Sequence, residues 1–158
     1  MIWREAMRAD VPAIVAMLSD DVLGKGRESA VLSPYLAAFD AMQAEGRNTI
    51  IVGDDAGEVV ACYQLTFISG LSLTAARRAL LEGVRVAASH RGRGLGETMM
   101  RDAEARARAA AGDASGRKGD ARFIAARADF AAARLATRHP GLAGLLAKPR
   151  WQAHWPSG

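Results

Sequence analysis

Residues 82–99 read EGVRVAASHRGRGLGETM, and this sequence is the most informative part of the chain. An apolar run, Leu80–Ala88, predicts a strand that leads into a glycine-rich loop, and the Ala-, Arg- and Glu-rich run of about Leu95–Ala111 predicts a helix after it. Glycines in such a loop let the backbone approach a ligand and turn its amide N–H groups inward, and the following helix adds the positive end of its dipole. Arginines within the loop add charge. The stretch is therefore suited to binding a pyrophosphate.

Two standard phosphate-binding motifs fit this loop poorly. A P-loop would end in Gly-Lys-Ser or Gly-Lys-Thr, whereas this loop continues as Gly96-Glu97-Thr98 without the lysine. A dinucleotide-binding fold has its loop after the first strand of a βαβ unit, with an acidic residue ~20 positions later. Here the loop follows the fourth predicted strand, so both motifs are excluded.

The chain before the loop predicts strands and helices in a definite order. Asp10 is a typical helix N-cap with Pro12 in the first turn behind it, and Gly46 is a typical helix end. A turn signal, Asp54–Gly57, separates two β-branched and aromatic-rich runs and predicts an antiparallel hairpin. The predicted elements are a strand over Ile2–Arg8, helices over about 11–22 and from Ser33 to about Glu45, and hairpin strands over Asn48–Gly53 and Glu58–Ser69. Together they predict an α/β chain with a mixed sheet.

The loop resembles the Arg/Gln-x-x-Gly-x-Gly/Ala element of the GCN5-related N-acetyltransferases, and Glu82–Val86 resembles the fourth strand of that superfamily. The resemblance covers about residues 1–111, over which the order of elements agrees. It implies a GNAT-like fold, in which a mixed, mostly antiparallel sheet is flanked by helices. It also implies acetyl-CoA as cosubstrate and transfer of its acetyl group to a primary amine of a small molecule or peptide.

The resemblance implies a cofactor site on the fourth strand and the loop. The backbone of the strand would pair with the pantetheine arm like an added strand, and a β-bulge near Val84–Val86 would splay the sheet. The backbone amides of the loop would hold the pyrophosphate. The residues implied are Val84, Arg85 and Val86 for the pantetheine arm, and Arg91, Gly92, Arg93, Gly94, Leu95, Gly96 and Glu97 for the pyrophosphate.

Glu82 is the predicted catalytic base. Acetyl transfer needs a base to neutralise the amine, a polarised thioester carbonyl and an acid for the leaving thiolate. In relatives a glutamate at this position takes the ammonium proton, usually through water, and a backbone N–H near Val84 would polarise the carbonyl. The alternative for Glu82 is a structural ion pair with Arg77, Arg78 or Arg85.

No acid can be named from the sequence. Relatives often supply a tyrosine from the helix after the fifth strand, in a pattern like Asp-Ala-x-Arg-Phe-Tyr. The nearest match here is Asp120–Ile124, with Ile124 in place of the tyrosine. Tyr63 is expected to be a packing residue, and Tyr35 could line the acceptor site.

The tail differs from the family pattern. Residues 112–158 are predicted to be a divergent C-terminal region of the same domain, because Gly112–Gly119 offers no apolar run for a fifth strand and about 120–136 is helix-compatible. A divergent tail, a shifted reading frame and a partner chain that completes the sheet are alternative explanations. The tail also motivates an alternative function, a catalytically degenerate acyl-CoA-binding module.

Composition limits the other function classes. The 158 residues are half apolar and about a quarter charged, which predicts one domain. The lone Cys62 excludes an internal disulfide and is expected to be buried filler, and three scattered histidines give no metal site. Apolar runs are shorter than the ~18–20 residues of a membrane span, and charges near the start argue against a signal peptide, so no membrane partner and a cytoplasmic location are expected.

The chain carries a net charge of +4, with a pI near 9.8. This excess could attract nucleic acid, but no nucleic-acid-binding module is recognisable, so such a partner is not expected. Trp151 and Trp155 near the end could instead form a dimer contact, which leaves a homodimer open.

Overall fold

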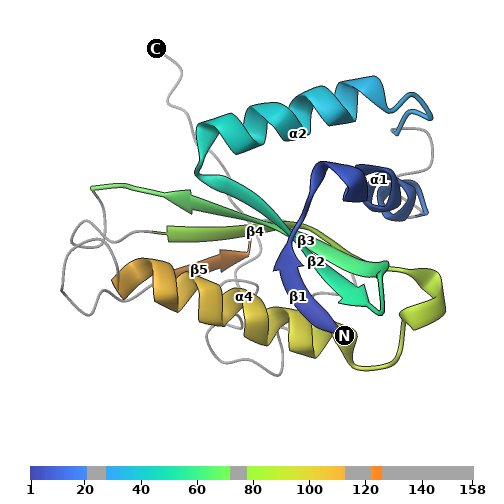
Figure 1. Ribbon diagram of the computed structural model, residues 1–158. Coiled ribbons are helices and arrows are strands. Elements are labelled where there is room, and N and C mark those ends of the chain that lie inside the picture. Colours follow the sequence, from blue (N-terminus) through green and yellow to red (C-terminus); the bar gives the residue numbers. More distant parts are fainter. Residues whose placement is uncertain (21–27, 72–77, 113–121, 126–158) are drawn as a thin grey trace, which may run out of the picture.

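The structure is a computed structural model that describes residues 1–20, 28–71, 78–112 and 122–125 (Figure 1). In this part of the chain the sheet has the strand order β1-β2-β3-β4-β5. The strands β1 to β4 pair in antiparallel fashion, whereas β5 runs parallel to β4. The strands are β1 (Ile2–Glu5), β2 (Asn48–Asp55), β3 (Glu58–Ile68), β4 (Arg78–Val86) and β5 (Arg122–Ala125). The predicted mixed, mostly antiparallel sheet is confirmed.

Helices cover both faces of this sheet. The helices are α1 (Val11–Ser19), α2 (Ser33–Glu45) and α4 (Leu95–Gly112). Figure 1 shows α1 and α2 on one face and α4 on the other. Because strand side chains alternate between faces, two separate apolar clusters are buried. One lies under α4 and includes Tyr63 and Met99, and the other lies under α1 and α2 and includes Phe39 and Cys62.

The predicted elements before the loop are confirmed, with differences at their ends. The first strand stops at Glu5, because a 3-10 turn over Arg8–Asp10 follows it, and α1 ends at Ser19 rather than near residue 22. Asp10 does occupy the N-cap position of α1, but its carboxylate makes no capping bond to that helix. It accepts the Met7 amide at 2.7 Å and the guanidinium of Arg4 instead.

The expectation that the tail supplies no fifth strand is wrong at Arg122–Ala125, a stretch that was expected to be helix-compatible. This short strand pairs with β4 from Arg78↔Arg122 to Leu81↔Ala125. Its parallel pairing relies on backbone hydrogen bonds to a strand some 44 positions earlier, which no local pattern reveals. The rest of the tail, including Trp151 and Trp155, lies outside the described residues, and the division at residues 111 and 112 stays a prediction.

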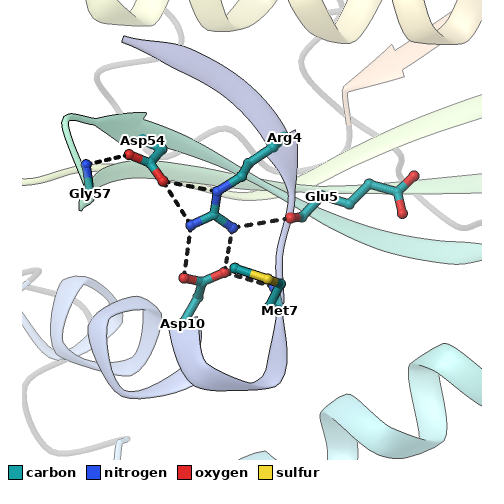
Figure 2. Close-up of polar contacts among 6 residues, drawn as sticks. All are labelled: Arg4, Glu5, Met7, Asp10, Asp54 and Gly57. Carbon is teal, nitrogen blue, oxygen red and sulfur yellow. Dashed lines mark hydrogen bonds and ion pairs between the residues drawn. The ribbon is translucent and has the colours of Figure 1, made fainter.

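A cluster of charged side chains around Arg4 fixes β1 to its surroundings (Figure 2). Arg4 donates to the Asp10 carboxylate at 2.7 and 3.0 Å and to the Asp54 carboxylate at 2.9 Å. The Asp10 carboxylate also accepts a hydrogen bond from the Met7 amide, and the Asp54 carboxylate accepts one from the Gly57 amide, both at 2.7 Å. The cluster therefore ties β1 to the turn before α1 and to the β2–β3 turn.

Candidate functional site

A β-bulge interrupts the pairing of β3 with β4. Cys62 pairs with Arg85 and Gln64 pairs with Glu82, so Tyr63 alone faces both Gly83 and Val84. Gly83 has a φ of 59°, in the left-handed region that glycine adopts at low cost. The bulge predicted near Val84–Val86 is therefore present at the start of that segment.

The bulge sets which way the β4 side chains point. Cys62 belongs to the apolar cluster under α1 and α2, and Gln64, two residues further along β3, faces the same way. Their partners across the ladder, Arg85 and Glu82, therefore also lie on the α1/α2 face of the sheet.

The sheet opens beyond the bulge. The described β4–β5 ladder ends at Leu81↔Ala125, so the edge of β4 from Glu82 to Val86 has no strand partner among the described residues. On the other edge the Ala87 amide donates to the Val60 carbonyl at 2.8 Å. By the alternation of an antiparallel ladder, the amide and carbonyl of Val86 point to the open edge.

Two arginine side chains donate hydrogen bonds to backbone carbonyls along this segment. Arg85 Nη1 donates to the Val84 carbonyl at 2.8 Å, and Arg91 Nε donates to the Val86 carbonyl at 3.1 Å. Arg91 also donates to Asp20, just after α1, at 3.0 Å. An extended ligand that pairs with β4 must displace these side chains, which are long enough to swing aside.

The loop between β4 and α4 presents a row of unused amides. The Arg91 amide donates to Ala88 at 3.4 Å and the Glu97 amide donates to Gly94 at 3.0 Å. Between them, the amides of Gly92–Gly96 have no acceptor among the described residues. Such a run of N–H groups at a helix N-terminus is an anion-binding nest.

Glycine gives the nest its shape. Gly92 and Gly94 have φ values of 79° and 78°, and a Cβ at either position would meet nothing within 4 Å. They are needed for their backbone conformation, and the space in front of them is open. Of the predicted loop ligands, Arg93 is exposed, whereas Glu97 uses its carboxylate in an ion pair with Arg101 at 2.6 Å.

Glu82 is half-buried beside the bulge. It forms no ion pair with any described residue, and Arg78 and Arg85 are among those described. The structural ion pair with either of these arginines is therefore not observed, and Arg77 lies outside the described residues. The carboxylate is left available to a ligand.

Neither tyrosine is placed as a free proton donor. Tyr63 is fully buried on the α4 face, where its hydroxyl donates to Asp102 at 2.5 Å, and burial raises its pKa. Its expected packing role is confirmed. The Tyr35 hydroxyl donates to Glu28 at 2.6 Å, which raises the pKa of Tyr35. Ile124, which was aligned with a helical tyrosine, lies in β5 instead.

Sequence reasoning missed a row of polar side chains next to Glu82. Asn48 Oδ1 accepts hydrogen bonds from Gln64 Nε2 at 2.9 Å and from Thr66 Oγ1 at 2.7 Å. Part of the signal was present, because Gln64 and Thr66 lie two positions apart on one predicted strand and so share a face. Only the register of the strands brings them together.

Other chemistries find little support in the described residues. Cys62 is buried as expected, and burial raises its thiol pKa to about 12, which disfavours an acyl-carrier role. No helix in the described ranges is both long and apolar enough to cross a bilayer. No group of three or more potential ligands for a metal ion occurs in them.

Solved structures share the fold. A transcriptional regulator of Bacillus halodurans C-125 is 27% identical over 98% of this chain and 99% of its own, with a TM-score of 0.78. A putative acetyltransferase of Agrobacterium tumefaciens str. C58 is 24% identical over 98% and 100%, with a TM-score of 0.73. A predicted acetyltransferase of Clostridium acetobutylicum, solved with acetyl-CoA, is 12% identical over 99% and 94%, with a TM-score of 0.60.

No curated protein sequence matches the chain. A family model does, and it covers the strands and the loop that form the site. Since the model of the acetyltransferase (GNAT) family matches residues 16–116, more than half of the sequence, the chain belongs to the GNAT acetyltransferases.

Proposed function

We propose that this GNAT protein is an N-acetyltransferase that moves an acetyl group from acetyl-CoA to a primary amine of a small molecule or peptide. The observation that carries the proposal is the row of unused amides at Gly92–Gly96, next to an open edge of β4. A pyrophosphate and an extended pantetheine arm need these two features side by side. Family membership supports acyl transfer in general.

The residues present fit acetyl-CoA. The nest at Gly92–Gly96 would hold the pyrophosphate, and the exposed arginines Arg91 and Arg93 would add charge. The Val86 amide and carbonyl would pair with the pantetheine amides, in the manner of strand addition. Arg85 and Arg91 would release the two carbonyls that they now occupy.

When bound, acetyl-CoA supplies an acetyl group activated as a thioester. Glu82 would take a proton from the acceptor ammonium, directly or through one water. The neutral amine could then attack the thioester carbon, with the carbon–sulfur bond breaking and water protonating the released thiolate. The backbone N–H near Val84, in the bulge, would donate to the thioester oxygen and stabilise the charge that develops on it. In this proposal the base and the polarising amide lie two residues apart, at the bulge.

A catalytically degenerate acyl-CoA-binding module is the second candidate. The placement of Tyr35 and Tyr63 favours it, because neither hydroxyl is free to protonate a leaving thiolate. Acetyl-CoA binding without acetylation of any amine would support this alternative. For either candidate we propose a cytoplasmic location. A homodimer through Trp151 and Trp155 stays a prediction.

Calorimetric titration with acetyl-CoA tests the proposal. We expect Gly94→Ala to weaken binding by about tenfold or more, because the left-handed conformation is strained for alanine and the nest changes shape. Gly94→Trp should abolish binding. Gly46→Ala is a matched control, since Gly46 also has a positive φ, of 65°, and open space around it, but lies at the end of α2.

Acetylation of an amine panel, followed by mass spectrometry, then separates the two candidates. Acetylated product with the wild type supports the enzyme. A folded wild type that does not bind acetyl-CoA would contradict both candidates, because both need the nest.

A further inference from the structure

A polar row runs across the α1/α2 face of the sheet from the reaction centre. Glu82 on β4 pairs directly with Gln64 on β3, and Asn48 on β2 pairs with Thr66, two residues beyond Gln64. Directly paired residues on one face have Cβ atoms about 5 Å apart, and each further strand adds about the same distance. A Cβ at Gly83, in the bulge, would lie 3.9 Å from the Cβ of Gln64. The row therefore begins at the bulge, beside Glu82.

The row stays accessible beyond the apolar cluster under α1 and α2. Val52 and Cys62 are fully buried in that cluster, and Ile50 packs at its margin. Asn48 lies two residues from Ile50 on β2, and Gln64 lies two residues from Cys62 on β3. Both are only partly buried. A ligand can reach their polar atoms without unpacking the core.

Some polar atoms of the row are already hydrogen-bonded to one another, and others have no partner among the described residues. Asn48 Oδ1 is saturated, because it accepts from both Gln64 Nε2 and Thr66 Oγ1. The Asn48 Nδ2 amide and the Gln64 Oε1 atom have no partner among the described residues. If both amides were turned over, the roles would exchange and one donor and one acceptor would still remain. The row thus presents an unpaired donor beside an unpaired acceptor.

We propose that Asn48 and Gln64 form an acceptor subsite that selects amines with an uncharged amide or hydroxyl group within a few bonds of the nitrogen. The inference rests on the proposed function, since it assigns specificity to that reaction. Such a group both accepts and donates hydrogen bonds, which complements the Asn48–Gln64 pair. The ammonium would lie toward Glu82. Thr66 acts as a positioning residue, because it holds the Asn48 amide in place.

A carboxylate on the acceptor is the main rival. Arg78 and Arg85 lie on the same face, further along β4 in either direction. However, Arg85 donates to the Val84 carbonyl, and Arg78 is opposite Ile68, beyond the polar row. The side chains directly beside Glu82 on β3 are neutral, which favours the uncharged group.

Acceptors of equal size test the subsite. Glycinamide, isobutylamine and glycine carry an amide, an isopropyl group and a carboxylate on the same aminomethyl unit, and each can be lengthened by one methylene. We expect the wild type to prefer the amide, and Asn48→Leu to reduce the ratio of kcat/KM for amide over alkylamine by about tenfold. Thr49→Val is the matched control, because Thr49 neighbours Asn48 but faces α4, and it should leave the ratio unchanged. Gln64→Met replaces Asn48→Leu if that variant does not fold.

A preference for glycine, or an amide-to-alkylamine ratio unchanged by either substitution, would overturn the subsite while leaving the acetyltransferase intact. Nuclear magnetic resonance covers the opposite case, in which no amine is acetylated. Titration with glycinamide should then shift the side-chain amide signals of Asn48 and Gln64, whereas isobutylamine should not. Absence of these shifts would overturn the subsite independently of turnover.

Discussion

Three properties of Glu82 suit it to act as a base: it is partly exposed, it lies beside the bulge, and it forms no ion pair with a described residue. A carboxylate in this state can accept a proton from an ammonium ion. We expect Glu82→Gln to lower kcat by about 10²-fold or more, because an amide cannot take up the proton. The Kd of acetyl-CoA should not change. Turnover across pH, together with calorimetry, checks both parts.

Glu58→Gln serves as the control for this substitution. Glu58 is exposed at the start of β3, next to the hairpin turn, and should affect neither turnover nor binding. If Glu82→Gln kept wild-type turnover at every pH, the proton would have to leave the amine by another route.

The conformation of single residues could be predicted from sequence where the information is local. The glycine loop combines its backbone conformation and its helix start within a few positions, so Gly92 and Gly94 could be recognised directly. Asn48 and Gln64 lie 16 positions apart and meet only through the hairpin register. Polar residues of this kind carry no local sign of a site, because the same types also occupy solvated strand faces.

The bulge in β4 is the element that places Glu82 opposite Gln64. Gly83 has a φ of 59°, and a Cβ there would make only an ordinary contact, 3.9 Å from Gln64. The penalty for a side chain is therefore conformational. We expect Gly83→Ala to lower the free energy of unfolding by about 1 kcal/mol, and Gly83→Asn by less, because asparagine tolerates this conformation better. Urea unfolding of the two variants measures both. Wild-type stability of Gly83→Ala would mean that the bulge has another conformation in solution.

Elements could be predicted wherever hydrophobic periodicity and turn residues mark them. The ends of α2 and the turn of the β2–β3 hairpin agree with expectation for this reason. β5 was missed because four residues at the sheet edge need no long apolar run when their partner strand supplies the pairing. The early end of β1 was missed as well, since the turn that follows it depends on Asp10 meeting the Met7 amide.

At the scale of the whole molecule, the Arg4 cluster joins β1, the turn before α1 and the β2–β3 turn (Figure 2). The hydrogen bond from Arg4 lowers the pKa of Asp10, helped by the Met7 amide and opposed by burial. The Gly57 amide and then Arg4 lower the pKa of Asp54. Both carboxylates therefore stabilise the fold above their ordinary pKa of 3.8, and this stability is lost as the pH falls through their lower folded values.

Arg4→Met removes the cation on which this cluster depends. We expect the free energy of unfolding at neutral pH to fall by about 1–2 kcal/mol, a value reduced by the partial exposure of the pair. Below the ordinary aspartate pKa, the wild type should lose stability more steeply than the variant, because the variant no longer holds Asp10 in its charged form. Arg8→Met is the control: the Arg8–Asp40 pair is more than half exposed on both sides, so its loss should change stability by only about 0.5 kcal/mol or less. Urea unfolding over a pH series measures all three proteins. Equal losses in the two variants would mean that the Arg4 cluster contributes no more than an ordinary surface ion pair. The anchoring of β1 would then rest on its backbone pairing with β2, the packing of Trp3 and the Arg106 hydrogen bond to the Trp3 carbonyl.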